Sequence, residues 1–296
     1  MAEKGEKGKR MTFVNRCMIA LGIAAAAVAC FGAAEAGILD RVKQDKTLRI
    51  AYRNDAPPFS FADATGVPAG FMVDLCRAVA KTMGAALNLG DLKVDYVLVT
   101  GANRFDAIKS GKADLLCEPT SDTLSRREEV DFSIATFIDG ASLLVNGEGP
   151  SEFGALAGKK VGVLAGTTTE QSLRETLASA KVNAEVVPAK THDEGLAMLE
   201  QGKIVAYFGD RAILAYLAAR SGSPGKLRVA NNYFSVEPYA LALPRGDSDF
   251  RLAVDRALSR IYRSGEIATI FTQSFGSQTQ PSDTLKTLYL ISALPE

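Results

Sequence analysis

The feature that most constrains the fold of this chain is a repeated alternation of short apolar segments with amphipathic ones. In the first half, the predicted strands are 47–53, 94–100 and 113–118, and the predicted helices are 70–84 and 103–111. The helix at 70–84 is indicated by Phe71, Leu75 and Val79, which helical spacing places on one face. Strands that alternate with helices along a chain favour an α/β sheet.

The same alternation restarts in the second half. There the predicted strands are 159–166, 184–190 and 204–210, and the predicted helices are 167–180, 191–203 and 211–222. Two segments, 137–145 and 235–247, connect the halves, and a helical stretch at 248–276 returns to the first half. Two crossings between two lobes make a hinge. We therefore predict an α/β fold of two lobes joined by two hinge crossings.

The N-terminus has the three parts of a secretory signal. Its first 16 residues carry five basic side chains, residues 17–31 are uncharged and rich in alanine, and small residues follow at Ala34 and Ala36. We predict cleavage after Ala36 and a periplasmic mature protein. An uncleaved membrane anchor and, less well supported, a lipid anchor at Cys30 are the alternatives. The predicted parts are a signal peptide (1–36), lobe 1 (37–137 plus 239–276), lobe 2 (138–238) and a C-terminal extension (277–296).

The predicted export determines which cysteines remain in the mature protein and whether they can form a disulfide. Cys17 and Cys30 leave with the signal peptide, so Cys76 and Cys117 remain as an even pair. The periplasm is oxidising, and paired cysteines in such a compartment usually form a disulfide. We predict a Cys76–Cys117 disulfide; the alternative is two buried free thiols.

Composition excludes some classes of function. The chain has 34 basic and 34 acidic residues among its 296, without the basic excess that nucleic-acid binding needs. It contains one histidine, which supports no metal site. Apolar residues make up 47% of the chain, enough for a sizeable core. We expect no nucleic acid, no metal and no cofactor.

Ligand sites in such folds lie beyond the carboxyl ends of the strands, often between domains. This rule selects eight candidate ligand-binding residues: Arg53, Arg104, Ser121, Arg126, Thr167, Thr168, His192 and Asp210. Arg126 can bind a carboxylate through two charge-assisted hydrogen bonds. The alternative for Arg126 is a solvated pair of charges with Arg127.

The remaining candidates also have two interpretations each. Thr167 and Thr168 begin a predicted helix, where an anion can bind or where a threonine simply caps the helix. Asp210 can pair with an ammonium group or can cap the helix that follows. His192 alone is more often a cap or a surface residue. Arg53 and Arg104 can neutralise a second carboxylate, or can be structural. Together these groups suit one ammonium and two carboxylates, which describes an acidic amino acid.

Six motifs carry a resemblance to a known family: "LRIAYRNDAPPFSF", "GFMVDLCRAVA", "NRFDAIKSGKADLLC", "TLSRREEVDFS", "VGVLAGTTTEQSL" and "VAYFGDRAIL". Over about residues 47–275 the chain resembles the family-3 periplasmic solute-binding proteins of amino-acid ABC transporters. It looks most like the glutamate/aspartate-binding branch. The resemblance implies a type II periplasmic-binding-protein-like fold, whose two α/β lobes close over the ligand.

The resemblance also implies roles for matching residues. Arg126 matches the arginine that clamps the α-carboxylate, Ser121 a hydroxyl beside it, and Thr168 with Thr167 the donors of the "GTT" loop. Asp210 matches the carboxylate that receives the α-ammonium. Arg53, Arg104 and His192 match contacts of the side-chain carboxylate.

Three positions depart from the family pattern. Glu118 replaces a small residue, Pro119 replaces a serine, and Gly101 stands where a serine precedes the "NR" pair. If Glu118 points inward, it opposes an acidic ligand and favours a neutral or cationic one.

The expected function is therefore a monomeric periplasmic receptor without enzymatic activity, which delivers a free amino acid to a membrane-embedded ABC permease. The alternative is an exported cyclohexadienyl (prephenate/arogenate) dehydratase-like enzyme, with Glu118 and His192 as acid and base. A sensor module acting on a membrane kinase in trans is a third interpretation.

Overall fold

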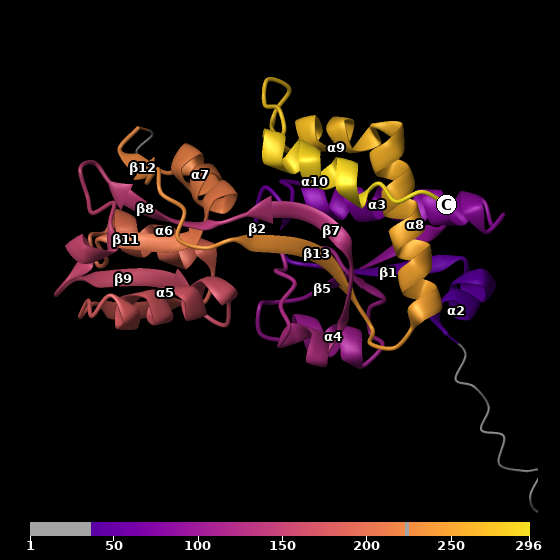
Figure 1. Ribbon diagram of the computed structural model, residues 1–296, viewed down its shortest axis with the longest axis horizontal. Helices are drawn as coiled ribbons and strands as arrows, with labels where there is room; N and C mark the ends of the chain where they lie inside the picture. The colour runs from indigo at the N-terminus through magenta and orange to yellow at the C-terminus, as the bar shows by residue number, and fades with distance from the viewer. Residues whose placement is uncertain (1–36, 223–224) are drawn as a thin grey trace, which may run out of the picture. The chain divides into compact units, whose positions relative to one another are not determined.

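The computed structural model describes residues 37–222 and 225–296 (Figure 1). The predicted signal peptide, its cleavage site and Cys30 lie outside the described residues. Within the described part, the chain forms two five-stranded sheets and one small three-stranded sheet. None of its described helices has the length and apolar character that crossing a membrane requires.

The first sheet has the strand order β5-β1-β6-β13-β7. Its strands are β1 (Thr47–Tyr52), β5 (Lys93–Leu98), β6 (Leu115–Leu116), β7 (Asp131–Asp139) and β13 (Glu237–Leu243). β1 pairs in parallel with β5 and β6, whereas β13 runs antiparallel to β6 and β7. The helices of this lobe are α2 (Ile38–Asp45), α3 (Phe71–Ala86), α4 (Arg104–Lys109), α8 (Ser248–Ser264), α9 (Glu266–Phe275) and α10 (Asp283–Ser292).

The second sheet has the strand order β10-β9-β11-β8-β12. Its strands are β8 (Ala141–Asn146), β9 (Lys160–Leu164), β10 (Glu185–Ala189), β11 (Ala206–Asp210) and β12 (Leu227–Val229). The helices that accompany it are α5 (Thr168–Ser179), α6 (His192–Glu200) and α7 (Arg211–Arg220). β9 pairs in parallel with β10 and β11, as predicted for strands that alternate with helices.

The chain passes between the two sheets twice. β7 ends at Asp139 in the first sheet, and β8 begins at Ala141 in the second. The return runs from β12 to β13, which lies beside β7 over most of its length (Figure 1). The predicted two-lobe α/β fold with two crossings is confirmed, while the exact lobe boundaries stay a prediction.

The last helices return to the first lobe. α8 packs against α3 and β7, and α10 packs against β7 and α8. The apolar stripe of α8 includes Phe250, Val254 and Leu258, all fully buried. The segment predicted as a C-terminal extension contains α10, whose Leu285 and Tyr289 join the core cluster of this lobe.

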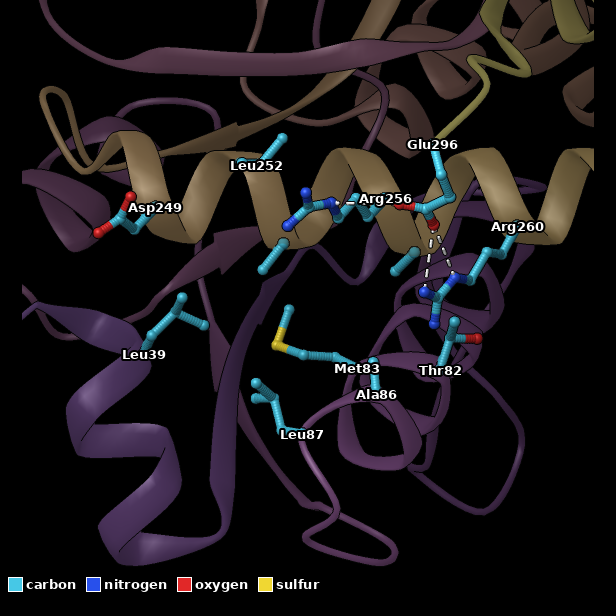
Figure 2. A pocket seen from close by; sticks show the side chains of 12 residues that line it. Leu39, Thr82, Met83, Ala86, Leu87, Asp249, Leu252, Arg256, Arg260 and Glu296 are labelled. Atoms are coloured by element: carbon cyan, nitrogen blue, oxygen red, sulfur yellow. Dashed lines mark hydrogen bonds and ion pairs between the residues drawn. The ribbon is translucent and has the colours of Figure 1, made fainter.

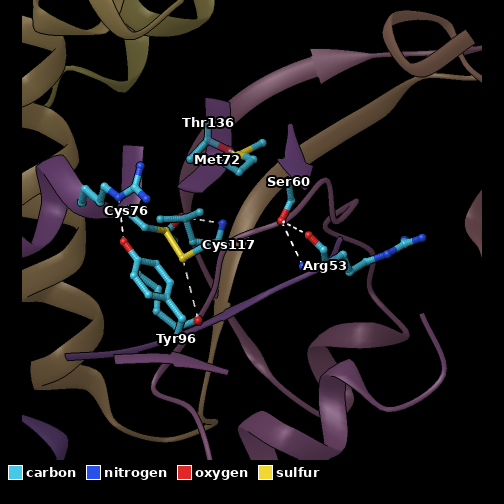
Figure 3. The surroundings of a disulfide bond; sticks show 11 residues. Arg53, Ser60, Met72, Cys76, Tyr96, Cys117 and Thr136 are labelled. Carbon is cyan, nitrogen blue, oxygen red and sulfur yellow. Dashed lines mark hydrogen bonds between the residues drawn. A yellow bond between two sulfur atoms is a disulfide. The ribbon is translucent and has the colours of Figure 1, made fainter. Parts of the chain in front are cut away.

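The predicted disulfide is present and joins Cys76 of α3 to Cys117 beyond β6 (Figure 3). Both residues are fully buried, and their Cα atoms lie 6.3 Å apart. The alternative of two free thiols is therefore wrong for this structure. The bond fixes the carboxyl end of β6, which is where the candidate site begins.

A small sheet and short helical turns complete the described fold. The sheet consists of β2 (Asp55–Ala56), β3 (Ser60–Ala62) and β4 (Pro68–Ala69), and the turns are η1 (Arg126–Glu128) and η2 (Phe153–Leu156). The sequence analysis predicted none of these, because strands of two or three residues show no usable periodicity. Asp55 of β2 nevertheless contacts the candidate site.

Candidate ligand-binding site

All eight predicted ligand-binding residues line one cavity. The cavity is completed by Pro119, Leu164, Thr169 and Ile213. Its walls come from the carboxyl ends of β1 and β6 in the first sheet, and of β9 and β11 in the second. Whether each residue binds a ligand stays a prediction, but the structure brings all eight together.

Arg126 lies at the start of η1 with its guanidinium turned to the cavity. Its Nη1 donates a hydrogen bond to Ser121 O at 2.8 Å. Burial and the nearby Arg104 lower the pKa of Arg126 to about 10, so it stays charged at neutral pH. Arg127 instead pairs with the carboxylate of Asp122 and is exposed. The interpretation of Arg126 and Arg127 as one solvated pair is therefore wrong.

Thr167 and Thr168 have different local roles. Thr167 Oγ1 accepts a hydrogen bond from Glu170 N at 3.1 Å, while the Glu170 carboxylate accepts one from Gly166 N. Thr167 is therefore the N-cap of α5, and Glu170 reaches back to the N–H one residue before the cap. Thr168 Oγ1 takes no part in the cap. It donates to Glu237 Oε2 at 2.8 Å, across the interface between the two lobes.

Asp210 occupies the N-cap position of α7 but makes no capping hydrogen bond. Asp139, at the end of β7, performs that function, because its Oδ2 accepts from Ala212 N at 3.1 Å. The interpretation of Asp210 as a helix cap is therefore wrong. Its Oδ1 is buried and has no hydrogen-bond partner among the described residues.

Asp139, Asp210 and Glu237 form a cluster of acidic side chains beside the cavity. Burial raises the pKa of Asp139 to about 6, and the charge of Glu237 adds to this effect. Burial, together with Asp139 and Glu237, raises the pKa of Asp210 well above its ordinary value. Carboxylates in this arrangement are stabilised by a cation placed next to them. The cluster can therefore receive an ammonium group.

His192 is 4% exposed and begins α6, whose cap is Thr191. Its Nδ1 lies 3.1 Å from the hydroxyl of Tyr207. Burial and the charge of Arg53 lower the pKa of His192 to about 3, so the ring is neutral. The interpretations of His192 as a helix cap or a surface residue are both wrong. A neutral imidazole here can exchange a hydrogen bond with a ligand without adding charge.

Arg53 and Arg104 also line the cavity, and each is 3% exposed. Arg53 donates from Nε and Nη2 to the carboxylate of Asp55, at 2.8 and 2.9 Å. Its backbone is held by Ser60, whose Oγ accepts from Arg53 N and donates to Arg53 O (Figure 3). Burial opposes the charge of Arg53, but Glu118 and Asp55 hold its pKa above the ordinary value.

The sequence left open which way Glu118 points, and the structure shows that it points inward. Its Oε2 lies 3.5 Å from Arg53 Nη1, and its Oε1 lies 3.4 Å from Arg104 Nη1. The hydroxyl of Thr120 also donates to Oε1. Glu118 is fully buried and is not part of the cavity lining.

Sequence reasoning missed three residues that contact the site: Asp55, Asp139 and Glu237. Glu237 Oε2 accepts from both Thr168 and Ser121, and its Oε1 accepts from Ser235 at 2.8 Å. Glu237 and Asp139 lie at the two crossings that the sequence predicted. Both could have been predicted as site residues, because each is a charged residue next to an apolar strand at a hinge crossing.

A second cavity lies elsewhere, between α2, α3 and α8 (Figure 2). It is lined by apolar side chains such as Leu39, Met83 and Leu87. At its rim, Arg260 donates to the side chain of Glu296. None of the eight predicted site residues lines it.

Comparison with known proteins gives a consistent result. Residues 48–277 match the profile of the bacterial extracellular solute-binding proteins, family 3. An L-glutamate/L-aspartate-binding protein of Pseudomonas aeruginosa is 34% identical over 247 residues, which span 83% of this chain and 81% of the relative. A glutamate/aspartate import solute-binding protein of Salmonella typhimurium is 29% identical over 273 residues, which span 91% of this chain and 90% of the relative.

Solved structures show the same likeness. An ancestral arginine-binding protein bound to glutamine superposes with a TM-score of 0.70 at 29% identity, covering 78% of this chain and 98% of that one. An ancestral amino acid-binding protein, described as a precursor of cyclohexadienyl dehydratase, superposes with a TM-score of 0.71 at 28% identity. It covers 81% of this chain and all of that one.

Proposed function

Since the chain belongs to family 3 of the bacterial extracellular solute-binding proteins, we propose that it captures an amino acid between its lobes and delivers it to a membrane-embedded ABC permease. The observation that carries this proposal is the placement of opposite charges across one cavity. Arg126 supplies a guanidinium and Asp210 supplies a carboxylate, and both line the same cavity.

The two ends of an α-amino acid fit these two groups. The α-carboxylate would take hydrogen bonds from Arg126 and from the amino-terminal N–H groups of α5 near Thr168. The α-ammonium would lie against Asp210, whose Oδ1 has no hydrogen-bond partner among the described residues. The ammonium would also stabilise the charge of the acidic cluster next to it.

The ligand's side chain would lie toward Arg53, Arg104 and His192. These groups present hydrogen-bond donors, and an acidic side chain that accepts them is the class we propose first. The names of the relatives support this class, because those of Pseudomonas aeruginosa and Salmonella typhimurium are glutamate/aspartate-binding proteins. We further propose that the protein works in the periplasm as a monomer, after removal of the signal peptide at 1–36.

The enzyme alternative assigned acid and base roles to Glu118 and His192. Glu118 is ion-paired with Arg53 and Arg104 and does not line the cavity. His192 has a pKa held at about 3, so it does not carry a proton to donate near neutral pH. Glu118 stands outside the cavity lining and His192 is a weak base, and both facts favour the receptor.

A ligand screen tests the proposal. The exported protein is titrated calorimetrically, and screened by thermal shift, with the twenty amino acids. A ligand at 100 times its Kd should stabilise the protein by about 2.7 kcal/mol. Arg126→Ala should weaken binding by about 2–5 kcal/mol, because it leaves a buried ligand carboxylate unpaired.

Arg127→Ala is the matched control, since Arg127 is exposed and pairs with Asp122. This variant should bind like the unaltered protein. The proposal fails if no amino acid binds, or if both arginine variants weaken binding equally.

A further inference from the structure

We propose that Glu118 determines the ligand's side-chain preference: it cancels one guanidinium charge in the cavity wall, so that the site accepts a neutral amide side chain, as in glutamine, nearly as well as the carboxylate of glutamate. This inference rests on the proposed function and refines the ligand of the same site.

The first step is the position of Glu118. It lies between Arg53 and Arg104, within 3.5 and 3.4 Å of one guanidinium nitrogen of each. Its side chain is fully buried. Two neighbours hold it there, because Cys117 is fixed by the disulfide to α3 and Thr120 donates to its carboxylate. Glu118 cannot turn to solvent without moving the end of β6.

The second step is the local charge. Arg53 and Arg104 carry two positive charges, while Asp55 and Glu118 carry two negative ones. This group of four side chains is therefore electrically neutral before a ligand enters. Without Glu118, it would carry one net positive charge, which is the usual way to select a carboxylate.

The third step is the number of donors that remain. Arg104 Nε has no hydrogen-bond partner among the described residues, and its ion pair with Glu118 uses only Nη1. A neutral His192 adds a group that can donate or accept. An amide oxygen can take these hydrogen bonds as well as a carboxylate oxygen can.

The two ligands then differ in whether the side chain brings a negative charge into the cavity. A glutamate side chain brings a negative charge into a buried, neutral environment, where an unbalanced charge is costly. A glutamine side chain brings none, and its amide oxygen still satisfies the guanidinium. We therefore expect glutamate and glutamine to bind within about tenfold of each other, since the coulombic advantage of the acid is cancelled locally.

The test is the ratio of glutamine to glutamate dissociation constants, measured by calorimetry on the exported protein. Glu118→Gln keeps the shape of the side chain and removes its charge. It should raise the preference for glutamate by about 10- to 100-fold, because one guanidinium charge is released. The matched control is Glu148→Gln, which removes the same charge from an exposed position after β8 and should leave the ratio unchanged.

The outcomes separate the two proposals. Glutamate binding more than about tenfold tighter than glutamine in the unaltered protein overturns the role of Glu118. The ratio of dissociation constants in the unaltered protein tests the role of Glu118 even if Glu118→Gln does not fold. A folded Glu118→Gln variant with an unchanged ratio overturns it equally. In either case an amino acid still binds and the receptor stands. If no amino acid binds, the proposed function itself fails.

Discussion

Ser121 Oγ lies 3.3 Å from Thr168 Oγ1, although the two residues belong to different lobes. Ser121 follows β6 of the first sheet, and Thr168 begins α5 beside the second. Both hydroxyls donate to the same oxygen, Glu237 Oε2, at the start of β13. These contacts join the two lobes beside the cavity, so they contribute to the closed state directly.

The first prediction concerns this pair of hydroxyls. Ser121→Ala and Thr168→Val should each weaken ligand binding, because closure loses a hydrogen bond. Since the two side chains share one acceptor, the double variant should differ from the sum of the single ones by about 0.5–3 kcal/mol. Calorimetric titration of the four proteins gives this coupling energy.

Ser125→Ala, an exposed hydroxyl in the same loop, is the control and should have no effect on affinity. Strict additivity of the Ser121 and Thr168 effects would show that the contact does not contribute to closure.

The second prediction concerns protons at the acidic cluster. The free cavity holds Asp210 with a pKa well above its ordinary value and Asp139 with a pKa of about 6. A bound ammonium lowers both, so the complex holds fewer protons than the free protein. Binding should therefore release protons near and above the pKa of Asp139, about 6, and the association constant should rise with pH in that range.

Calorimetry in two buffers of different ionisation enthalpy measures the released protons directly. Asp210→Asn should abolish most of the release, whereas Asp193→Asn, an exposed partner of Arg220, should not change it. Equal heats in both buffers for the unaltered protein would contradict the assignment of Asp210 as the ammonium partner.

The third prediction concerns Gly195 in α6. A Cβ atom at this position would lie 2.1 Å from Cε2 and 2.4 Å from Cζ of the Tyr207 ring. Tyr207 is fully buried, and its hydroxyl contacts His192. Gly195→Ala should displace the ring, lower the free energy of unfolding by about 1–3 kcal/mol and weaken ligand binding through His192.

Gly154→Ala is the matched control, because a Cβ there would meet nothing within 4 Å. Urea unfolding and calorimetric titration compare the two variants. A Gly195→Ala protein with unaltered stability and affinity would show that Tyr207 can move without disturbing the cavity.

The fourth prediction concerns the disulfide. Cys76 and Cys117 are 41 residues apart, so the bond restricts the unfolded chain. Replacing both with alanine should lower the free energy of unfolding by about 3–4 kcal/mol, as expected for a loop of this length. Thiol titration of the processed, unfolded and unreduced protein should find no free thiol. Two free thiols, or a double variant as stable as the original, would contradict the structure.

Much of the fold and of the candidate site was predictable from the sequence. The alternation of strand and helix patterns predicted both lobes, because burial of one face imposes its period on the residues of each element. The strand ends then selected Arg53, Arg126 and Asp210, since the carboxyl ends of parallel strands meet at one edge of a sheet. Local rules also predicted that a threonine caps the helix at 167–180, as Thr167 does.

The charge state of the site was decided only by the tertiary structure. Asp139 caps α7 in place of Asp210, and Glu118 is enclosed by Arg53 and Arg104. Glu237 accepts from Ser121, 116 positions away in the chain. Such pairs depend on the packing of distant segments, and no local period records them. The sequence alone thus determined eight of the residues that line the cavity, while packing determined which of their charges remain for a ligand.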